Sequence, residues 1–296
     1  MRVLTKEREA IEEDTEIIRQ PTISIILPSL NTAALIDRAL TSIHQQTYQN
    51  FEVLIIDNCS KDGTADVVKK FTEQDNRFTL ICEKDNGIYD AMNKGIERSK
   101  GEWLYFLGAD DSLYASDTLQ NVAQAIIESA DTEIFYGDVR LNFPFPNEPD
   151  KLIYDGKFDS IKLLKKCICH QSIFVRRSVF ERFGNFNSKY YLSADYDFNL
   201  RCFNSVSQRY LDFIVAEYST NGRSSQSLEG DKLFYKDFLL NMAVRYSYSY
   251  KDDFFKGRKK ELFLLFKQEM KSFRLRSASR IGRILLHHGL LKKLVF

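Results

Sequence analysis

Acidic and amide side chains follow the ends of four apolar segments in the N-terminal half of the chain. The four segment ends are Pro28-Ser-Leu-Asn31, Asp57-Asn58, Cys82 to Asn86 and Gly108-Ala-Asp-Asp111. Three of them carry carboxylates, which suit Mg²⁺ or Mn²⁺ when a substrate phosphate shares the ion. The sequence has no Gly-x-Gly-x-x-Gly after the first segment and no Gly-x-x-x-x-Gly-Lys-Ser/Thr. We therefore expect an anionic ligand to be bound through a divalent cation rather than through a glycine-rich phosphate loop.

Alternating short strands and helices must position these residues. Strands are expected over 22–27, 51–56, 78–82 and 103–107, and helices over 32–46, 64–75 and 89–99. This alternation predicts an α/β fold with a mainly parallel sheet, in which ligands bind outside the carboxyl ends of the strands. Beyond residue 107 we expect helices over 117–129 and 194–203 and strands over 133–140, 172–175 and 209–215.

The composition is that of a folded globular protein. The 296 residues are 44% hydrophobic and 28% charged, with a net charge of +1. No apolar run reaches the ~18 residues of a membrane span, and the charged first 20 residues do not resemble a signal peptide. Five Cys without metal-ligand spacing favour a reducing, cytoplasmic compartment. We expect the closest pair, Cys167 and Cys169, to lie in a core strand, with a metal or redox pair as the alternative.

Four ordered segments resemble the inverting glycosyltransferases of family 2. They read PTISIILPSLN (21–31), VLIIDNCSKDGT (53–64), DNGIYDAMNKG (85–95) and GEWLYFLGADD (101–111). The resemblance covers about residues 21–220 and is strongest to the subgroup that builds bacterial O-antigen, capsule and colanic-acid polysaccharides. It implies an α/β fold of the GT-A type over 21–220, after an N-terminal polar extension (1–20) and before a helical, basic C-terminal region (221–296).

The resemblance also implies a nucleotide-sugar donor whose diphosphate is held by Mn²⁺ or Mg²⁺. Asp110 and Asp111 match the metal motif, in which Gly108 stands where a first carboxylate is common; a helix cap is the alternative for this pair. Asp57 matches the carboxylate that reads the uracil or ribose, and capping its own loop is the alternative. The donor-binding residues implied are Pro28, Ser29, Asn31, Asp57, Asn86, Asn93 and Asp110.

The acceptor half of the family is matched by residues 170–172 and 193–201. Asp195 matches the general base that activates an acceptor hydroxyl, although Ala194 replaces the usual Glu. Asp197 competes for that role, but two positions along a helix place it ~200° away. Arg201 is expected to fix the helix, and His170 to line the pocket. A sugar-stacking wall is expected from Tyr190, Tyr191 and Tyr196.

Charge is distributed unevenly along the chain. Residues 256–296 hold 12 Lys or Arg and 2 Asp or Glu, which leaves the rest of the chain acidic. Apolar and basic residues alternate in 271–276 and 281–296, as they do in interfacial helices. We expect this region to dock on an anionic membrane, with packing on the acidic catalytic domain as the alternative. It lacks the aromatic pattern of a nucleic-acid groove.

These observations favour a metal-dependent inverting glycosyltransferase of surface polysaccharide biosynthesis. Its expected donor is a UDP-sugar and its expected acceptor a glycan or lipid-linked glycan, used in the cytoplasm or at the inner face of the membrane. A sugar-phosphate nucleotidyltransferase is the first alternative, but it would need a Gly-rich, basic signature that residues 28–31 lack. A non-catalytic GT-A-like binding protein is the second.

Overall fold

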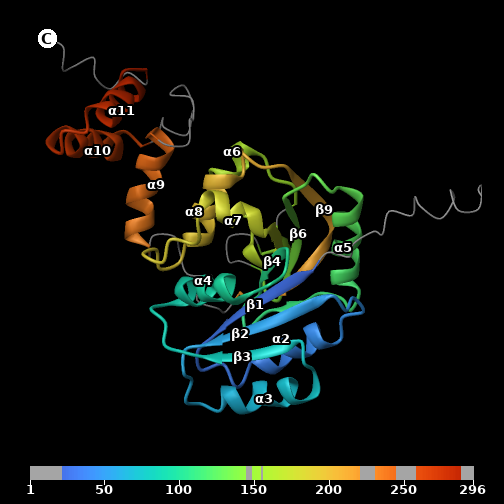
Figure 1. Cartoon of the computed structure of the whole chain (residues 1–296). Coiled ribbons are helices and arrows are strands. Elements are labelled where there is room, and N and C mark those ends of the chain that lie inside the picture. The colour runs from blue at the N-terminus through green and yellow to red at the C-terminus, as the bar shows by residue number, and fades with distance from the viewer. Residues whose placement is uncertain (1–21, 145–148, 155, 221–230, 245–257, 288–296) are drawn as a thin grey trace, which may run out of the picture.

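The described strands form one sheet of nine, with helices on both faces (Figure 1). The structure is a computed structural model, and it describes residues 22–144, 149–154, 156–220, 231–244 and 258–287. The strand order is β3-β2-β1-β4-β8-β6-β9-β5, and β7 pairs with β6. The strands are β1 (Ile23–Ser29), β2 (Phe51–Asp57), β3 (Phe78–Cys82), β4 (Trp103–Phe106), β5 (Ser112–Leu113), β6 (Ile134–Leu141), β7 (Ile153–Tyr154), β8 (Ile173–Arg176) and β9 (Gln208–Tyr218).

The half of the sheet built from β3, β2, β1 and β4 is parallel. Ser29 lies opposite Asp57, and Asp57 lies opposite Cys82, so the carboxyl ends of these strands share one edge. All seven residues of β1 are buried, because both faces of the sheet are covered, and this explains its almost continuous apolar sequence. Beyond β4 the sheet is mixed, since β8 pairs antiparallel with both β4 and β6 while β9 runs parallel to β6.

Two apolar layers cover the sheet. Ile23, Ile25 and Leu27 of β1 face one layer, and the alternate residue Ile26 faces the other. The first layer contains α2 (Ile36–His44), α3 (Thr64–Gln74) and α5 (Thr118–Glu128). The second contains α4 (Ile88–Arg98), α6 (Ser160–Leu163), α7 (Arg177–Phe183) and α8 (Ala194–Cys202), and the 3₁₀ helix η1 (His170–Ser172) precedes β8.

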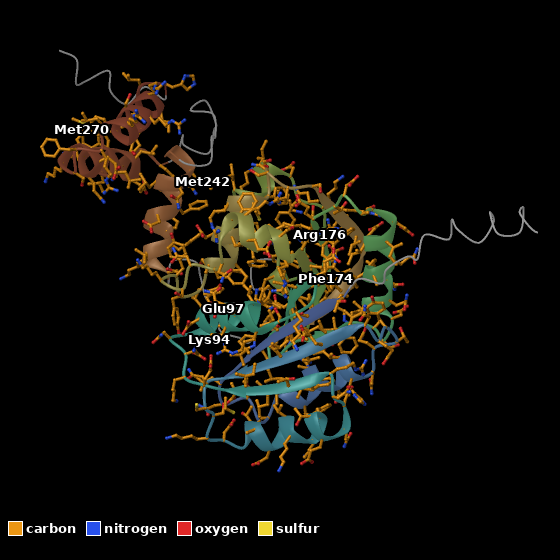
Figure 2. All side chains as sticks on the ribbon, viewed as in Figure 1. Lys94, Glu97, Phe174, Arg176, Met242 and Met270 are labelled. Carbon is orange, nitrogen blue, oxygen red and sulfur yellow. The ribbon has the colours of Figure 1, made fainter. Side chains whose placement is uncertain are left out.

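Three further helices form a unit that extends away from the sheet (Figure 1). They are α9 (Lys232–Val244), α10 (Lys259–Lys271) and α11 (Leu275–His287). Phe234 and Phe238 of α9 lie with ring centroids 5.4 and 5.7 Å from that of Tyr196 on α8, which joins the unit to the second layer. Figure 2 places Met242 where α9 meets the other two helices and Met270 on the outer side of the unit. None of the described helices is long and apolar enough to cross a membrane.

The structure differs from the sequence expectations in three respects. The helix α2 begins at Ile36 rather than near residue 32, because the chain turns through Asn31, whose φ is 52°. Cys167 and Cys169 lie in the irregular segment before η1 and not in a strand. The short elements β5, β7, α6 and α7 were not predicted. The expected extension over 1–20 and the start of the C-terminal region over 221–230 lie outside the described residues.

Candidate active site

Asp57 ends β2 at the shared strand edge and is buried there. Its two carboxylate oxygens accept hydrogen bonds from the Ser60 backbone N–H at 2.7 Å and the Ser60 hydroxyl at 2.6 Å. The structure therefore shows the loop-capping contact that the sequence left as an alternative. A contact between Asp57 and a nucleoside stays a prediction.

The loop after β1 is tied to the loop after β2. Asn31 is exposed, its backbone N–H donates to the Ser60 hydroxyl at 2.8 Å, and its side-chain carbonyl accepts from the Lys61 N–H at 3.1 Å. The Ser29 hydroxyl bonds the Thr32 hydroxyl at 2.8 Å. Pro28 pairs in register with Ile56 of β2. These contacts place Pro28, Ser29 and Asn31 beside Asp57, as the parallel sheet predicts.

The turn that begins α4 is built around Asp85. Its carboxylate accepts from the Asn58 side-chain amide at 2.8 Å and from the Gly87 N–H at 2.9 Å. Burial raises the pKa of Asp85 above its ordinary value, more than the Gly87 N–H and the charge of Lys94 lower it. Asn86 is exposed, and its N–H donates to Asp90 at 2.8 Å.

Asn93 on α4 does not face open space. Its amide nitrogen donates to the Phe186 carbonyl at 2.9 Å, and its amide oxygen accepts from the Phe186 N–H at 3.0 Å. Asn93 thus joins α4 to the segment that precedes α8. A contact between Asn93 and a donor stays a prediction.

Asp110 and Asp111 lie between β4 and β5, so the alternative of a helix cap is wrong. Asp111 is buried, and its carboxylate accepts from the Gln171 amide at 2.7 Å and the Ser219 N–H at 2.8 Å. Burial, and after it the charge of Asp110, raises the pKa of Asp111 to about 6. Asp110 is half-buried, and its backbone carbonyl accepts from Arg38.

A steric reason explains why Gly108 stands where a first carboxylate is common in the metal motif. A Cβ atom at this position would lie 2.4 Å from Asp111 Oδ2 and 3.0 Å from Asp110 Oδ1. Asp111 is buried and held by two hydrogen bonds, which a shift of its carboxylate would disturb. A carboxylate at position 108 is therefore incompatible with this arrangement of Asp110 and Asp111.

This carboxylate pair fits a divalent cation. Two adjacent carboxylates, one of which raises the pKa of the other, form an oxygen donor set in which bound Mg²⁺ or Mn²⁺ would relieve the repulsion. Among the described residues, no three His, Cys, Asp or Glu side chains are grouped as a metal site. A cation at Asp110 and Asp111 would therefore take its other ligands from substrate phosphate and water.

Asp195 lies in the first turn of α8 and is held on both oxygens. The Tyr89 hydroxyl donates to Oδ1 at 2.7 Å, and His170 Nδ1 lies 3.2 Å from Oδ2. The Asp195 and His170 side chains are 15% and 14% exposed, so both still reach the surface of the site.

The electrostatics of the pair keep Asp195 ionised. Burial alone would raise the pKa of Asp195, but the hydrogen bonds and charge of His170, with Tyr89, lower it below its ordinary value. Burial would lower the pKa of His170, but Asp195, and then Asp111 and Asp110, raise it. The charges of both carboxylate sites therefore raise the pKa of His170, because the two sites lie near one another.

Asp197, the competing base, has a structural contact. It is buried, and Arg201 Nε lies 2.8 Å from its Oδ2. Arg201 also donates to the carbonyls of residues 183, 184 and 185. The expectation that Arg201 fixes the helix is confirmed, and Asp197 is its partner on the side of α8 away from His170.

The expected wall of three tyrosines is wrong for two of them. Tyr190 and Tyr196 are buried, and their hydroxyls donate to Asp237 and to the Leu163 carbonyl. They are core residues: Tyr190 joins the segment before α8 to α9, and Tyr196 joins α8 to α6. Tyr191 is 60% exposed and remains available to a sugar.

Sequence reasoning gave no role to Tyr89, Gln171 or Ser219, although the structure brings all three to the site carboxylates. Tyr89 lies inside the third matched segment and Gln171 lies next to His170. Their positions in these motifs could have marked them as candidate site residues. Their partners are known only from contacts between segments that are distant in the sequence.

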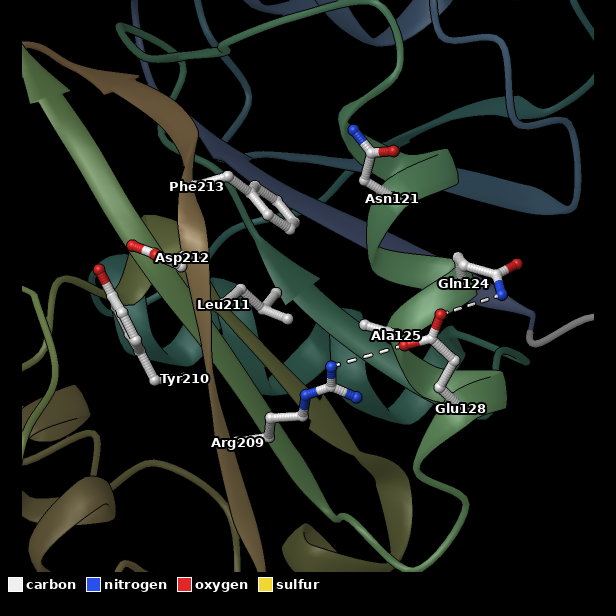
Figure 3. Close-up of a pocket in the computed structure, with 9 residues that line it drawn as sticks. All are labelled: Asn121, Gln124, Ala125, Glu128, Arg209, Tyr210, Leu211, Asp212 and Phe213. Atoms are coloured by element: carbon white, nitrogen blue, oxygen red, sulfur yellow. Dashed lines mark hydrogen bonds and ion pairs between the residues drawn. The ribbon is translucent and has the colours of Figure 1, made fainter.

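A separate hollow of about 400 Å³ lies between α5 and β9 (Figure 3). Arg209 and Glu128 form an ion pair of 3.5 Å across it, and Gln124 donates to Glu128 at 3.2 Å. None of the site residues expected from sequence lines this hollow. The hollow is therefore separate from the candidate site at the strand edge.

Paired carboxylates at the edge of the parallel half-sheet, with an oriented carboxylate on a neighbouring helix, define a glycosyltransferase of the GT-A type. Residues 24–184 match the family described as Glycosyl transferase family 2, and the chain belongs to that family. The expected family and fold are thereby confirmed, and the protein is a glycosyltransferase.

Curated relatives and solved structures agree with this assignment. A PGL/p-HBAD biosynthesis glycosyltransferase of Mycobacterium bovis is 41% identical over 220 residues, which are 73% of this chain and 83% of the relative. The putative teichuronic acid biosynthesis glycosyltransferase TuaG of Bacillus subtilis is 30% identical over 46% of this chain and 56% of the relative.

Two solved structures share the fold at 18% identity. The crystal structure of S. aureus TarS 1–349 in complex with UDP-GlcNAc has a TM-score of 0.58 and covers 81% of this chain and 66% of that chain. The mannosyltransferase PcManGT from Pyrobaculum calidifontis, in complex with GDP-Man and Mn²⁺, has a TM-score of 0.54 and covers 97% of this chain and 78% of that chain.

Proposed function

We propose that this glycosyltransferase moves a sugar from a UDP-sugar to a glycan or lipid-linked glycan, with inversion at the anomeric carbon and with the help of a divalent cation. The main support is that two carboxylate sites, the Asp110 and Asp111 pair and Asp195, are contacted by the consecutive η1 residues Gln171 and His170. One site suits a departing diphosphate, and the other suits an attacking hydroxyl.

In the proposed reaction, Asp195 accepts the proton of the acceptor hydroxyl as the oxygen attacks the anomeric carbon. The bond to the diphosphate breaks on the opposite face, so a single displacement inverts the configuration and needs no covalent intermediate. Asp110 and Asp111 would hold Mn²⁺ or Mg²⁺, which neutralises charge on the diphosphate when bound. Tyr89 and His170 keep the Asp195 carboxylate oriented and ionised.

The names of the relatives support an acceptor from cell-surface glycan or glycolipid synthesis. The two alternatives left open by sequence are less well supported. A nucleotidyltransferase does not agree with membership of family 2, and a non-catalytic protein would have no need of an ionised, oriented Asp195.

Donor binding should be specific for the uridine nucleotide and should depend on the cation. We expect a UDP-sugar with Mn²⁺ to raise the unfolding temperature more than a GDP- or dTDP-sugar, because a ligand at a hundredfold excess over its Kd adds ~2.7 kcal/mol to stability. Thermal-shift measurements with and without Mn²⁺ test this. Asn31→Ala should reduce the shift, whereas Asn121→Ala, an equally exposed site on α5, should keep it. A larger shift with GDP-sugars would contradict the donor assignment.

We further propose that the C-terminal helical unit docks on an anionic membrane through the tip between α10 and α11, residues 270–276. Every residue of this tip is exposed, including Phe273 at 85% and Leu275 at 60%. Lys271, Arg274 and Arg276 are close to these apolar residues in the sequence, and Arg274 lies 3.4 Å from Glu269. An exposed tip that carries both apolar and basic residues has the chemistry of an interfacial anchor.

The tip is connected to the active site through α9. Asp231, which precedes α9, accepts from the Leu192 N–H at 2.9 Å and from the Phe234 N–H at 3.1 Å. Leu192 lies three positions before Asp195. The 13 residues of α9 rise ~20 Å from this contact toward the other two helices. Docking would therefore bring a lipid-linked acceptor to the side of the enzyme that carries Asp195.

Membrane binding should require both the apolar residues and the charge of the tip. Phe273→Ser should weaken binding to phosphatidylglycerol-containing vesicles about tenfold or more, since burial of a Phe side chain is worth ~1.5–3 kcal/mol. Co-sedimentation with vesicles measures this, and vesicles of phosphatidylcholine alone should bind weakly. Phe143→Ser removes a Phe that is 59% exposed on the catalytic domain and is the matched control. Equal sedimentation of the two variants would instead favour the alternative in which the C-terminal region packs on the catalytic domain.

A further inference from the structure

We propose that His170 and Gln171 are positioning residues that hold the general base and the metal-binding carboxylate at a set separation. This inference rests on the proposed function, because it takes Asp195 as the base and Asp111 as a metal ligand. His170 Nδ1 lies 3.2 Å from Asp195 Oδ2, and Gln171 Nε2 donates to Asp111 Oδ2 at 2.7 Å. Two consecutive side chains of η1 therefore bind the two carboxylates.

The backbone of this pair is anchored to the centre of the sheet. The Gln171 carbonyl accepts from the Tyr105 hydroxyl of β4 at 2.8 Å. The Tyr105 ring stacks on Phe174 of β8, with centroids 4.4 Å apart and planes 10° from parallel. Figure 2 places Phe174 within the sheet. Since β4 and β8 are paired strands, η1 is fixed relative to the strand end that carries Asp111.

The side-chain chemistry suits this role. Gln171 is buried, and its amide oxygen accepts from the Cys169 thiol at 2.8 Å, so its amide nitrogen is directed at Asp111. The neutral amide of Gln171 orients Asp111 and leaves its negative charge for a cation. A lysine ammonium at this position would neutralise that charge itself. His170 in turn orients one oxygen of Asp195, while Tyr89 orients the other.

In-line displacement needs the deprotonated acceptor oxygen and the departing diphosphate on opposite sides of the anomeric carbon. A misplacement of ~1 Å can cost ~10²-fold in rate. Loss of either contact should therefore lower kcat more than it lowers donor affinity. A residue that served only the fold would change the unfolding temperature and leave kcat of the folded enzyme intact.

His170→Leu removes the donor to Asp195, and we expect kcat to fall on the order of 10²-fold while the Kd for UDP with Mn²⁺, measured by calorimetry, stays near wild type. His170→Asn keeps an N–H donor in the place of Nδ1 and should recover most of the loss. Gln171→Met keeps the side-chain volume without the donor and should both lower kcat and raise the Kd for Mn²⁺.

Ser172→Ala is the matched control, because Ser172 is buried in the same 3₁₀ helix but its hydroxyl donates to the Cys169 carbonyl at 2.8 Å and not to a site carboxylate. It should keep kcat. A Ser172→Ala variant that loses as much kcat as His170→Leu would overturn the inference, as would a His170→Leu variant with wild-type kcat. If Asp195→Asn were itself fully active, the proposed function would fail, and not this inference alone.

Discussion

Asp195→Asn should lower kcat by ~10² to 10⁴, the usual cost of losing a general base. The amide cannot take the proton of the acceptor hydroxyl, while the volume at the start of α8 is unchanged. Binding of UDP and Mn²⁺, measured by calorimetry, should stay near wild type because Asp195 is not one of the two carboxylates, Asp110 and Asp111, proposed to hold the cation. Initial rates at saturating donor and acceptor measure kcat.

Asp197→Asn is the matched control on the same helix. It removes the charge that pairs with Arg201, so the unfolding temperature should fall while kcat of the folded enzyme is kept. Wild-type kcat in Asp195→Asn together with a loss in Asp197→Asn would show that the base had been assigned to the wrong carboxylate.

The pH dependence should carry the signature of the Asp195–His170 pair. Since the pKa of Asp195 is lowered, it stays ionised, and the acid limb of kcat/KM should lie below the ordinary carboxyl value of ~3.9. Its stabilising contribution is present above that value and is lost as pH falls through the lowered pKa. The pKa of His170 is raised, so its contribution is complete below ~6.5 and is lost as pH rises through the raised pKa. The pair should therefore stabilise the fold most between about pH 4 and 6.5.

Asp110→Ala should reduce turnover by on the order of 10² to 10³-fold or more, because several kcal/mol of charge stabilisation at the diphosphate are lost and each 1.36 kcal/mol is tenfold in rate. Removal of divalent cations with EDTA should have an effect of similar size on the wild type, and added Mn²⁺ should reverse it. Rates measured across a Mn²⁺ titration separate a loss of metal affinity from a loss of turnover.

The control for this prediction is Asp212→Asn, which removes an exposed carboxylate on β9 at the hollow of Figure 3. It should change neither the rate nor its Mn²⁺ dependence. Full activity in EDTA would show that the diphosphate leaves without a cation, and the role of Asp110 and Asp111 would then have to be structural.

Much of the catalytic fold could be predicted from local sequence. Continuous apolar runs such as the one that ends at Pro28 require a strand buried on both faces, and their alternation with helical segments requires parallel pairing. Parallel pairing alone brings Ser29, Asp57 and Asp110 to one edge. For this reason candidate site residues could be listed from strand ends, and Arg201 could be assigned to the helix from spacing.

The partners of Asp195 and Asp111 depended on contacts that no spacing encodes. Tyr89 reaches Asp195 because α4 and α8 pack in the same layer on the sheet. Gln171 reaches Asp111 because η1 precedes β8, which pairs with β4. The short strand β5 forms only because β9 provides an edge for it. Tyr191 is exposed whereas Tyr190 and Tyr196 are buried, and this difference could not be predicted from three tyrosines so close in the sequence.

The sequence by itself determined the class of the protein, the parallel half of the sheet and the carboxylates that could carry the chemistry. Only the tertiary structure decided which of those carboxylates are capped, paired or accessible. Hydrogen-bond partners and burial set the charge state and direction of a carboxylate, and at this site those partners are distant in the sequence. Asp57 accepts hydrogen bonds from Ser60 within its own loop, whereas Asp195 is held by Tyr89 and His170 from other parts of the chain.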